Sequence, residues 1–180
     1  MSLLMLLGDQ KRINEDYLII SSFIFTVMKI TIREMTANDA KAVNTLSKQL
    51  GYPLSINQTL HNINAVLQSK DHTAFVAEYE KEIVGWVGAS QAIMIEVMPY
   101  CEINGLVIDQ DHRGMGIGKL LIDKVKQWAR EKNNSKIGLH CNVKRTEAHL
   151  FYEHLGFVEI KQQKNFVINI SKNKRTQPFL

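Results

Sequence analysis

The sequence predicts an α/β (α+β) domain in which a central β-sheet is flanked by about four helices. Short segments such as 30–33 alternate apolar and polar side chains, which is typical of strands with one buried face. A later segment carries one apolar stripe at helical spacing, formed by Ile117, Leu121, Val125 and Trp128. Between these two kinds of element lies a glycine-rich run at 113–119, which follows a strand-like segment and opens that helix.

One strand and two helices are expected to open the domain. The strand covers 30–33, and the first helix begins at 36–39 and ends near Gly51. Ser55 and Gln58 form a Ser-x-x-Gln capping box, which predicts a second helix that runs to about Gln68.

The rest of the chain predicts five or six further strands and two further helices. Strands are expected at 73–79, 83–94, 100–108, 136–141, from Phe157 onward and at 165–170. The charged turn Glu80-Lys81-Glu82 joins the first two of them. The helix after the glycine-rich run continues to about Lys132, and the other helix carries Tyr152. The resulting order is one strand, two helices, three strands, a helix, a strand, a helix and two strands.

The glycine-rich run Arg113 to Lys119 is the most informative feature of the chain. Three of the ten glycines fall within five residues there. Glycine permits positive φ and lets a ligand approach the backbone. A helix that begins at such a loop directs its unpaired N–H groups and the positive end of its dipole at the ligand. The combination predicts a site for a phosphate or pyrophosphate group.

Two familiar phosphate-binding loops do not match this run. A nucleoside-triphosphatase loop requires a first glycine where Arg113 stands, and Ser or Thr where Leu120 follows Lys119. A dinucleotide-binding loop requires Gly-x-Gly-x-x-Gly tight against the first strand of its unit. Here the spacing is Gly-x-Gly-x-Gly, five residues beyond the strand.

The pattern Arg/Gln-x-x-Gly-x-Gly/Ala is met by Arg113, Gly116 and Gly118. It resembles the coenzyme A signature of the GNAT superfamily of N-acetyltransferases. The resemblance covers about 30–170, and the predicted element order matches the GNAT fold. That fold implies a mixed, mostly antiparallel sheet of six to seven strands, splayed between the fourth and fifth strands.

A second motif downstream also resembles this family. Ala148, Phe151, Tyr152, Gly156 and Phe157 fit the pattern Ala-x-x-Phe-Tyr-x-x-x-Gly-Phe. Ala148 and Tyr152 are four residues apart and therefore share a helical face. In the family the tyrosine often protonates the departing thiolate of coenzyme A; the other interpretation of Tyr152 is a half-buried packing residue.

One position departs from the family pattern. Many relatives carry Asn three residues before the alanine, where Arg145 stands in this chain. The stretch from Asn142 to Tyr152 instead resembles aminoalkylphosphonate and some aminoglycoside acetyltransferases. Arg145 is expected either to hold a phosphate of the cofactor or to be a solvated residue in the first turn of the helix.

The resemblance implies direct acetyl transfer from acetyl-CoA, as cosubstrate, to an amine. It implies a cofactor site formed by Leu106, Val107, Ile108, Arg113, Gly114, Met115, Gly116, Ile117, Gly118, Lys119, Asn142, Arg145 and Tyr152. Tyr152 and Glu102 are the expected catalytic residues, with Glu102 as the base that accepts the proton of the amine. Glu96 and a chain of water molecules are the alternative bases.

The expected acceptor is the primary amine of a small molecule, such as an aminoalkylphosphonate, an aminoglycoside, a polyamine or an amino-acid-like compound. Two alternatives remain open. One is acetylation of protein lysines or N-termini, and the other is a GNAT module that binds acetyl-CoA without catalysis. The sequence does not identify the acceptor.

Composition and charge argue against several other kinds of function and structure. The 180 residues carry a formal net charge of +4, too small to indicate nucleic-acid binding. Two cysteines are too few for a disulfide framework and favour a reducing, cytoplasmic location. The histidines show no metal-ligand spacing, so no metal is expected, and no apolar run is long enough to cross a membrane.

The domain organisation follows from the same features. Residues 1–27 are expected to form an N-terminal extension of unknown role, 28–172 the single acetyltransferase domain, and 173–180 a short tail. The apolar part of the extension, 17–27, contains many β-forming residues and is a candidate for self-association, so a homodimer is among the expected states.

Overall fold

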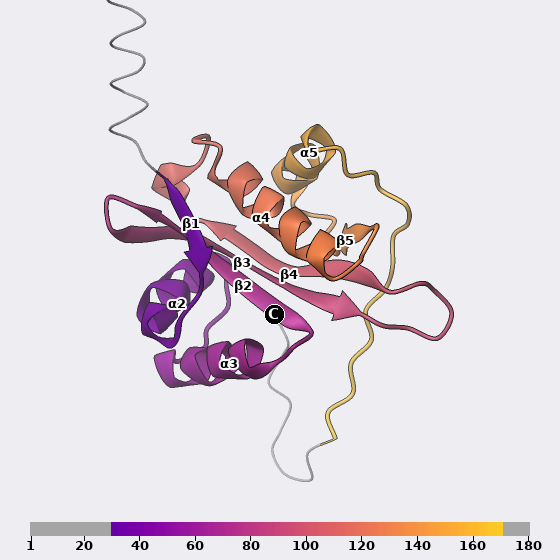
Figure 1. Ribbon diagram of the computed structural model, residues 1–180, viewed down its shortest axis with the longest axis horizontal. Coiled ribbons are helices and arrows are strands. Elements are labelled where there is room, and N and C mark those ends of the chain that lie inside the picture. The colour runs from indigo at the N-terminus through magenta and orange to yellow at the C-terminus, as the bar shows by residue number, and fades with distance from the viewer. Residues whose placement is uncertain (1–29, 171–180) are drawn as a thin grey trace, which may run out of the picture.

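The computed structural model describes residues 30–170, which form a twisted sheet with helices on both faces (Figure 1). The elements are β1 (Thr31–Glu34), α2 (Ala40–Gln49), α3 (Ile56–Gln68), β2 (His72–Tyr79), β3 (Glu82–Ala92), β4 (Tyr100–Ile108), α4 (Ile117–Glu131), β5 (Ile137–Leu139) and α5 (Thr146–His154). Short 3₁₀ helices cover Ala37–Asp39 and Gln110–His112. The predicted extension 1–27, the domain boundary at Met28 and the tail 173–180 lie outside the described residues.

The sheet is mixed and mostly antiparallel, as predicted. Within residues 30–170 its strand order is β1-β2-β3-β4-β5, and only the β4–β5 pair there is parallel. The pairing of β4 with β5 covers Cys101 to Ile103, whereas the pairing of β4 with β3 continues to Ile108. The second half of β4 therefore has no strand on its β5 side within residues 30–170, which is the predicted splay.

The two faces of the sheet carry different helices (Figure 1). One face packs against α4, whose stripe residues Ile117, Leu121 and Val125 are at most 1% exposed. The other face packs against α2 and α3, through a smaller cluster that includes Val43, Ile63 and Val76. The predicted apolar stripe of α4 is confirmed, because its residues enter the larger core.

The two N-terminal helices are fixed by polar groups at their ends. The predicted capping box at the start of α3 is present: the Ser55 hydroxyl accepts a hydrogen bond from the Gln58 amide. Asn44 of α2 is 1% exposed, and its side-chain amide donates to the Leu54 carbonyl at 2.8 Å and to the Thr59 hydroxyl at 2.9 Å. This buried amide joins α2, the connecting loop and α3.

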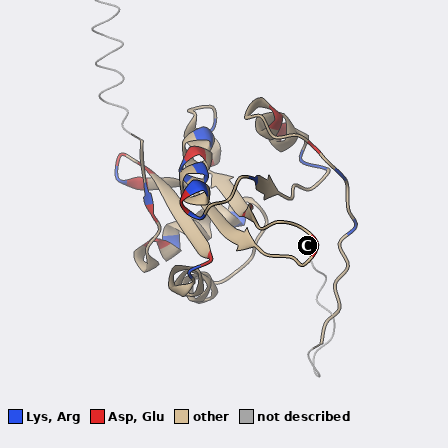
Figure 2. Cartoon of the chain, turned by 45° about the vertical axis from the view of Figure 1, so that its right-hand side comes forward, with Lys and Arg blue, Asp and Glu red and all other residues tan. Residues whose placement is uncertain are grey.

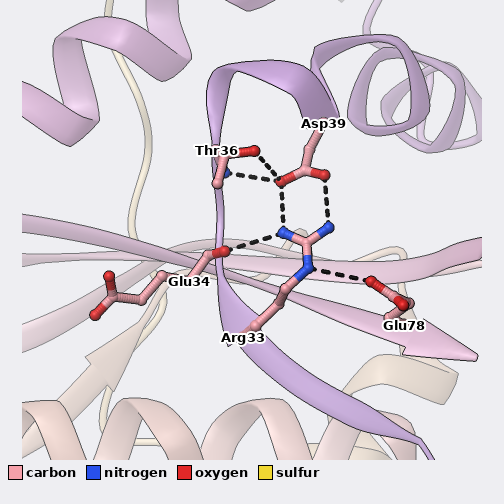
Figure 3. A network of polar contacts seen from close by, with 5 residues as sticks. All are labelled: Arg33, Glu34, Thr36, Asp39 and Glu78. Atoms are coloured by element: carbon pink, nitrogen blue, oxygen red, sulfur yellow. Dashed lines mark hydrogen bonds and ion pairs between the residues drawn. The ribbon is translucent and has the colours of Figure 1, made fainter. Parts of the chain in front are cut away.

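A charged network joins β1 to the start of the helical region (Figure 3). The Arg33 guanidinium donates to both carboxylate oxygens of Asp39, each at 2.8 Å, and to Glu78 of β2 at 3.1 Å. The Asp39 carboxylate also accepts from the backbone N–H of Thr36. The hydrogen bonds from Arg33 hold the pKa of Asp39 below its usual range.

A β-bulge interrupts β4 immediately before its splayed half. Gly105 lies opposite Gly88 and Ile103 opposite Ala89, so Asn104 has no opposite residue on β3. Gly105 is required beside the bulge, because a Cβ there would lie 2.8 Å from the Trp86 ring. The bulge changes which side chains of β4 face α4, and it brings Val107 onto the same face as Trp86.

The structure corrects the predicted strand number. The sheet formed by the described residues has five strands rather than six to seven. The difference lies at the C-terminus, where the strands predicted from Phe157 and at 165–170 are absent and 157–170 form no regular element. An alternating sequence becomes a strand only when a neighbouring edge supplies hydrogen-bond partners, and none of the strands within residues 30–170 pairs with this segment.

Candidate active site

The two sequence motifs meet at one cavity of about 810 Å³. It lies where the splayed half of β4, the glycine-rich loop, the start of α4 and the start of α5 converge. The cavity is lined by these residues of the predicted site: Leu106, Val107, Ile108, Arg113, Gly114, Gly116, Ile117, Gly118, Lys119, Arg145 and Tyr152. Leu50, at the end of α2, also lines it. Three predicted residues do not line it: Met115, Asn142 and Glu102.

The glycines of the loop differ in what they require. Gly114 and Gly116 have φ of 79° and 78°, and beyond their chain neighbours no atom of residues 30–170 lies within 4 Å of a Cβ placed on either. Their backbone conformation needs glycine, and the space beside them is open to a ligand. Gly118 is a packing residue instead, since a Cβ there would lie 2.8 Å from Phe151 of α5. The close approach of α4 and α5 therefore depends on Gly118.

The start of α4 faces the cavity and favours an anion. Gly116 is its N-cap, so the first N–H groups of this 15-residue helix have no partner within the helix. Among residues 30–170, four Lys or Arg side chains line the cavity, namely Arg113, Lys119, Lys144 and Arg145, against one acidic residue, Glu147. Lys119 also pairs with Asp123 at 2.6 Å on α4, a helix that carries many Lys, Arg, Asp and Glu positions (Figure 2). The donors and the open glycine backbone fit the pyrophosphate of coenzyme A.

Sequence reasoning missed the residue that shapes the loop before the glycines. Asp109 follows β4 directly, and its carboxylate accepts from the Asp111 amide at 3.1 Å and contacts His112 Nδ1 at 2.9 Å. Gln49 at the end of α2 donates to the same carboxylate at 2.9 Å. These hydrogen bonds lower the pKa of Asp109, and the hydrogen bond from Gln49 has the largest effect. An aspartate at the end of a strand often accepts a hydrogen bond from the backbone amide two residues later and so forms a turn. This sequence signal could have indicated the role of Asp109.

Tyr152 points its ring into an aromatic group on the cavity wall. Its ring contacts those of Phe151 and Phe157 edge to face, with centroids 5.2 and 5.7 Å apart. Burial raises the pKa of Tyr152, and the nearby Cys141 raises it further, while Arg145 opposes the change. The phenol therefore keeps its proton at neutral pH, which suits a group that gives a proton to a departing thiolate.

Asn142 and Met115 have structural contacts in place of positions in the cavity wall. The Asn142 side chain accepts from the Lys144 amide at 2.9 Å, and its carbonyl accepts from the Arg145 amide at 2.9 Å. His149 of α5 contacts the same carbonyl at 3.0 Å. Asn142 thus orders the turn that presents Arg145, the N-cap residue of α5. Met115 packs against the larger core.

Glu102 lies on β4 before the bulge, opposite Ser90 of β3. Its carboxylate contacts Nδ1 of His140 at 2.8 Å, and the side chains of Glu102 and His140 are 22% and 67% exposed. The neighbouring Cys101 is fully buried. Burial, with a smaller contribution from the nearby Glu102, raises the pKa of its thiol to about 11. Glu96 lies on the exposed 93–99 loop between β3 and β4.

Two other kinds of feature are absent from residues 30–170. No three His, Cys, Asp or Glu side chains of this part come together as metal ligands would. No helix of this part is long and apolar enough to cross a membrane.

Comparison with known proteins agrees with the fold. The model of the acetyltransferase (GNAT) family matches residues 39–157. An uncharacterised N-acetyltransferase of Bacillus subtilis, YhdJ, is 26% identical over 130 residues, which are 71% of this chain and 92% of that protein.

Solved structures of similar fold include two aminoglycoside acetyltransferases. AAC(6')-Iy, solved with CoA, superposes with a TM-score of 0.72 at 21% identity and covers 78% of this chain and 95% of its own. AAC(6')-IG of Acinetobacter haemolyticus gives 0.70 at 19% identity, over 78% of this chain and 99% of its own. With the family model matched over both motifs, the chain belongs to the GNAT acetyltransferase family and is an N-acetyltransferase.

Proposed function

We propose that this acyltransferase moves an acetyl group from acetyl-CoA directly to the primary amine of a small molecule. The observation that carries the proposal is the cavity in which both motifs meet, with a helix start, two open positive-φ glycines and basic walls. Acetyl-CoA supplies the activated acetyl group as a thioester. The residues of this chain then have to bind it, admit the amine and move two protons.

Binding is assigned to the loop and the two helix starts. The N–H groups at the start of α4 and residues 113–119 are suited to the pyrophosphate, and Arg145 and Lys144 lie on the wall across the cavity. The splayed half of β4 leaves backbone groups at Leu106 to Ile108 without a strand partner on the cavity side. These groups are the candidates to orient the acetyl group and to donate to its oxygen as charge develops there.

Tyr152 is proposed as the acid that serves the leaving thiol. Its ring contacts those of Phe151 and Phe157, and burial raises the pKa of its hydroxyl further above neutral, so the proton is present to be donated. The state of Cys101 supports direct transfer of the acetyl group from acetyl-CoA to the amine, without an acetylated cysteine. This thiol is fully buried and its pKa is raised to about 11, so it is unsuited to carry the acetyl group between substrates.

Glu102 is proposed as the base for the amine. An alkylamine has a pKa of about 10.4 and must lose a proton before it attacks. Glu102 precedes Leu106 by four residues, roughly 13 Å along a strand, so a chain of water molecules is expected to connect the carboxylate to the amine. The contact with the exposed His140 fixes the carboxylate and leads toward solvent.

A small acceptor is supported by two independent resemblances. The stretch from Asn142 to Tyr152 resembles aminoalkylphosphonate and aminoglycoside acetyltransferases. The solved structures of similar fold include two enzymes named for aminoglycosides. Aminoglycosides, aminoalkylphosphonates, polyamines and amino-acid-like amines are therefore the classes to test.

The test is thiol release from acetyl-CoA with a panel of these amines and with a lysine peptide. We expect turnover with at least one small amine and none above background with the peptide. The Glu102→Gln variant should lower kcat/KM strongly and change its rise with pH, while calorimetry finds acetyl-CoA binding nearly unchanged. Acetylation of the peptide alone would overturn the small-amine assignment, and a parent-like pH profile for Glu102→Gln would exclude that residue as the base.

A further inference from the structure

The end of α2 is joined to the start of the glycine-rich loop by one side chain, that of Gln49. Its amide nitrogen donates to Oδ2 of Asp109 at 2.9 Å, and its amide oxygen accepts from the backbone N–H of Gln110 at 3.3 Å. These partners lie 60 and 61 positions away in the sequence. Gln49 is the last residue of α2, and Asp109 directly follows β4. Both polar groups of this side chain therefore connect the helix to the segment that opens the loop.

The segment on the far side of this connection leads directly into the loop. Asp109 is the N-cap of the 3₁₀ helix Gln110–His112, and its Oδ1 accepts from the Asp111 amide at 3.1 Å. His112 Nδ1 contacts the same oxygen at 2.9 Å. His112 lines the cavity, and so does Arg113, which follows this short helix. The two carboxylate oxygens thus have separate partners: Oδ2 binds α2, and Oδ1 holds the turn into the loop.

The near side of the connection places part of the cavity wall. Leu50, the residue after Gln49, lines the cavity, whereas the other lining residues within 30–170 all belong to 106–155. Gly51, with φ of 88°, ends α2 immediately afterwards. The following loop is held at Leu54, whose carbonyl accepts from the buried side-chain amide of Asn44 at 2.8 Å. The end of α2 is therefore fixed both to its own helix pair and to the glycine-rich loop.

The connection bears on ligand binding through the geometry of the loop. The N–H groups of the loop bind a phosphate only when they are held at hydrogen-bond distance from it, and a loop that must be ordered on binding loses affinity. A carboxylate beside an anion site is unfavourable by charge alone. Any benefit of Asp109 to an anionic ligand therefore comes from the geometry that its hydrogen bonds impose, and Gln49 supplies one of them.

We propose that Gln49 is a positioning residue of the acetyl-CoA site. Its two hydrogen bonds hold Asp109 and Gln110 where the loop can bind the pyrophosphate, and they couple this binding to the position of Leu50 on the cavity wall. Because coupling is reciprocal, acetyl-CoA should in turn order the end of α2. The inference rests on the proposed binding of acetyl-CoA at this cavity, and it adds a residue that lies outside both sequence motifs.

An exchange of the two side-chain types tests the connection. In Gln49→Glu two carboxylates face each other, and in Asp109→Asn no orientation of the two amides keeps all the hydrogen bonds. The double variant Gln49→Glu/Asp109→Asn restores them, because the new amide donates to the new carboxylate, which still accepts from the Gln110 N–H. The oxygen that accepts from the Asp111 amide is also kept, and the net charge equals that of the parent.

Calorimetry with acetyl-CoA on the full chain measures the affinity of each variant. We expect each single variant to bind at least about 5-fold more weakly, the lower end of a typical coupling, and the double variant to return close to the parent affinity. The sign for Asp109→Asn is decisive, because loss of a negative charge near the phosphates would alone strengthen binding. Hydrogen exchange should show that acetyl-CoA slows the Leu50 and Gly51 amides in the parent and in the double variant, but much less in the single variants.

The matched control is Gln127→Glu on α4. Gln127 also donates to a carboxylate, that of Glu131 at 3.1 Å, but it does not line the cavity, so its variant should keep the parent affinity. Unchanged or tighter binding by Asp109→Asn, or a double variant as weak as the single ones, would overturn the role of Gln49 alone. A parent chain that does not bind acetyl-CoA would instead overturn the proposed function of the cavity, and this inference with it.

Discussion

At the scale of single residues, Tyr152 gives the most direct chemical test. Its ring packs between Phe151 and Phe157, so Tyr152→Phe keeps the packing and removes only the hydroxyl. We expect kcat to fall by about 10²- to 10⁴-fold, the usual contribution of a positioned acid, while acetyl-CoA affinity stays nearly unchanged. Steady-state kinetics on the best amine, with calorimetry for acetyl-CoA, measure the two effects.

Tyr79→Phe is a control for this experiment. Tyr79 also makes an edge-to-face contact, with His112, but its side chain does not line the cavity. Its kcat should remain close to that of the parent. If Tyr152→Phe and Tyr79→Phe retain similar kcat values, Tyr152 is a packing residue and another group protonates the thiol.

At the scale of elements, the position of α5 against α4 depends on Gly118. A Cβ at this position would lie 2.8 Å from the Phe151 ring, so Gly118→Ala must displace Phe151 and with it the helix that carries Tyr152. We expect a loss of about 1–3 kcal/mol of unfolding free energy, as for other overpacked sites. Addition of Phe151→Leu, which shortens the clashing ring, should restore part of that loss. Denaturant unfolding of the two variants measures the difference, and equal stability would show that the clash is not relieved at Phe151.

A second element-scale prediction concerns the junction of β1 and the helical region. The pKa of Asp39 is lowered in the folded protein, chiefly by its hydrogen bonds from Arg33 (Figure 3). A carboxyl group with a lowered folded-state pKa stabilises the fold above its ordinary pKa of 3.8, and that contribution is lost as the pH falls through the folded-state value. Asp39→Asn should therefore cost about 1–3 kcal/mol near pH 7 and progressively less below pH 3.8.

Urea unfolding of the parent and of Asp39→Asn across this pH range measures the contribution. Asp123→Asn provides a comparison, because its carboxylate is 40% exposed and pairs with exposed lysines. A surface pair of this kind contributes about 0–1 kcal/mol. A cost for Asp39→Asn that does not shrink at low pH would assign its effect to packing and not to the ion pair.

At the scale of the whole molecule, the sequence predicted what local patterns determine. The first four strands, the capping box of α3 and the apolar stripe of α4 are all set by periodicity and caps, and all four α-helices were expected. Asn44 was missed because its partners are ten or more residues away. The contact of Asp109 with Gln49 was missed because it joins two elements 60 positions apart. The strands at 157–170 were wrong in the single chain, because alternation indicates a strand but not the edge that must receive it.

The residues of the candidate site also fall into two groups, those that local patterns predict and those that depend on contacts between distant parts of the chain. The glycines and Tyr152 were predicted from motif spacing, and the structure brings them to one cavity, which Arg145 also lines. The contact of Glu102 with His140 joins β4 to the residue after β5, 38 positions away, and no local pattern indicates it. The bulge at Asn104, which sets the direction of the side chains that follow it, also depends on pairing with β3.

Binding at this cavity should stabilise the whole domain, because a ligand that binds only the folded chain shifts the unfolding equilibrium. Acetyl-CoA at about 100 times its Kd contributes about 2.7 kcal/mol, which corresponds to a rise in Tm of roughly 5 to 10 °C for a chain of this size. The Gly116→Val variant should lose most of that rise, because the branched side chain occupies the open space beside the loop.

Gly51→Val is the matched control for backbone strain. Gly51 has φ of 88°, close to the 78° of Gly116, and a Cβ on either glycine meets no protein atom within 4 Å. Both variants should therefore lose a similar amount of stability without ligand, about 1–3 kcal/mol for a side chain in this region of φ. Only Gly116 lines the cavity, so Gly51→Val should keep the full rise in Tm with acetyl-CoA. Thermal unfolding followed with and without acetyl-CoA separates the two effects, and an equal rise in both variants would place the cofactor elsewhere.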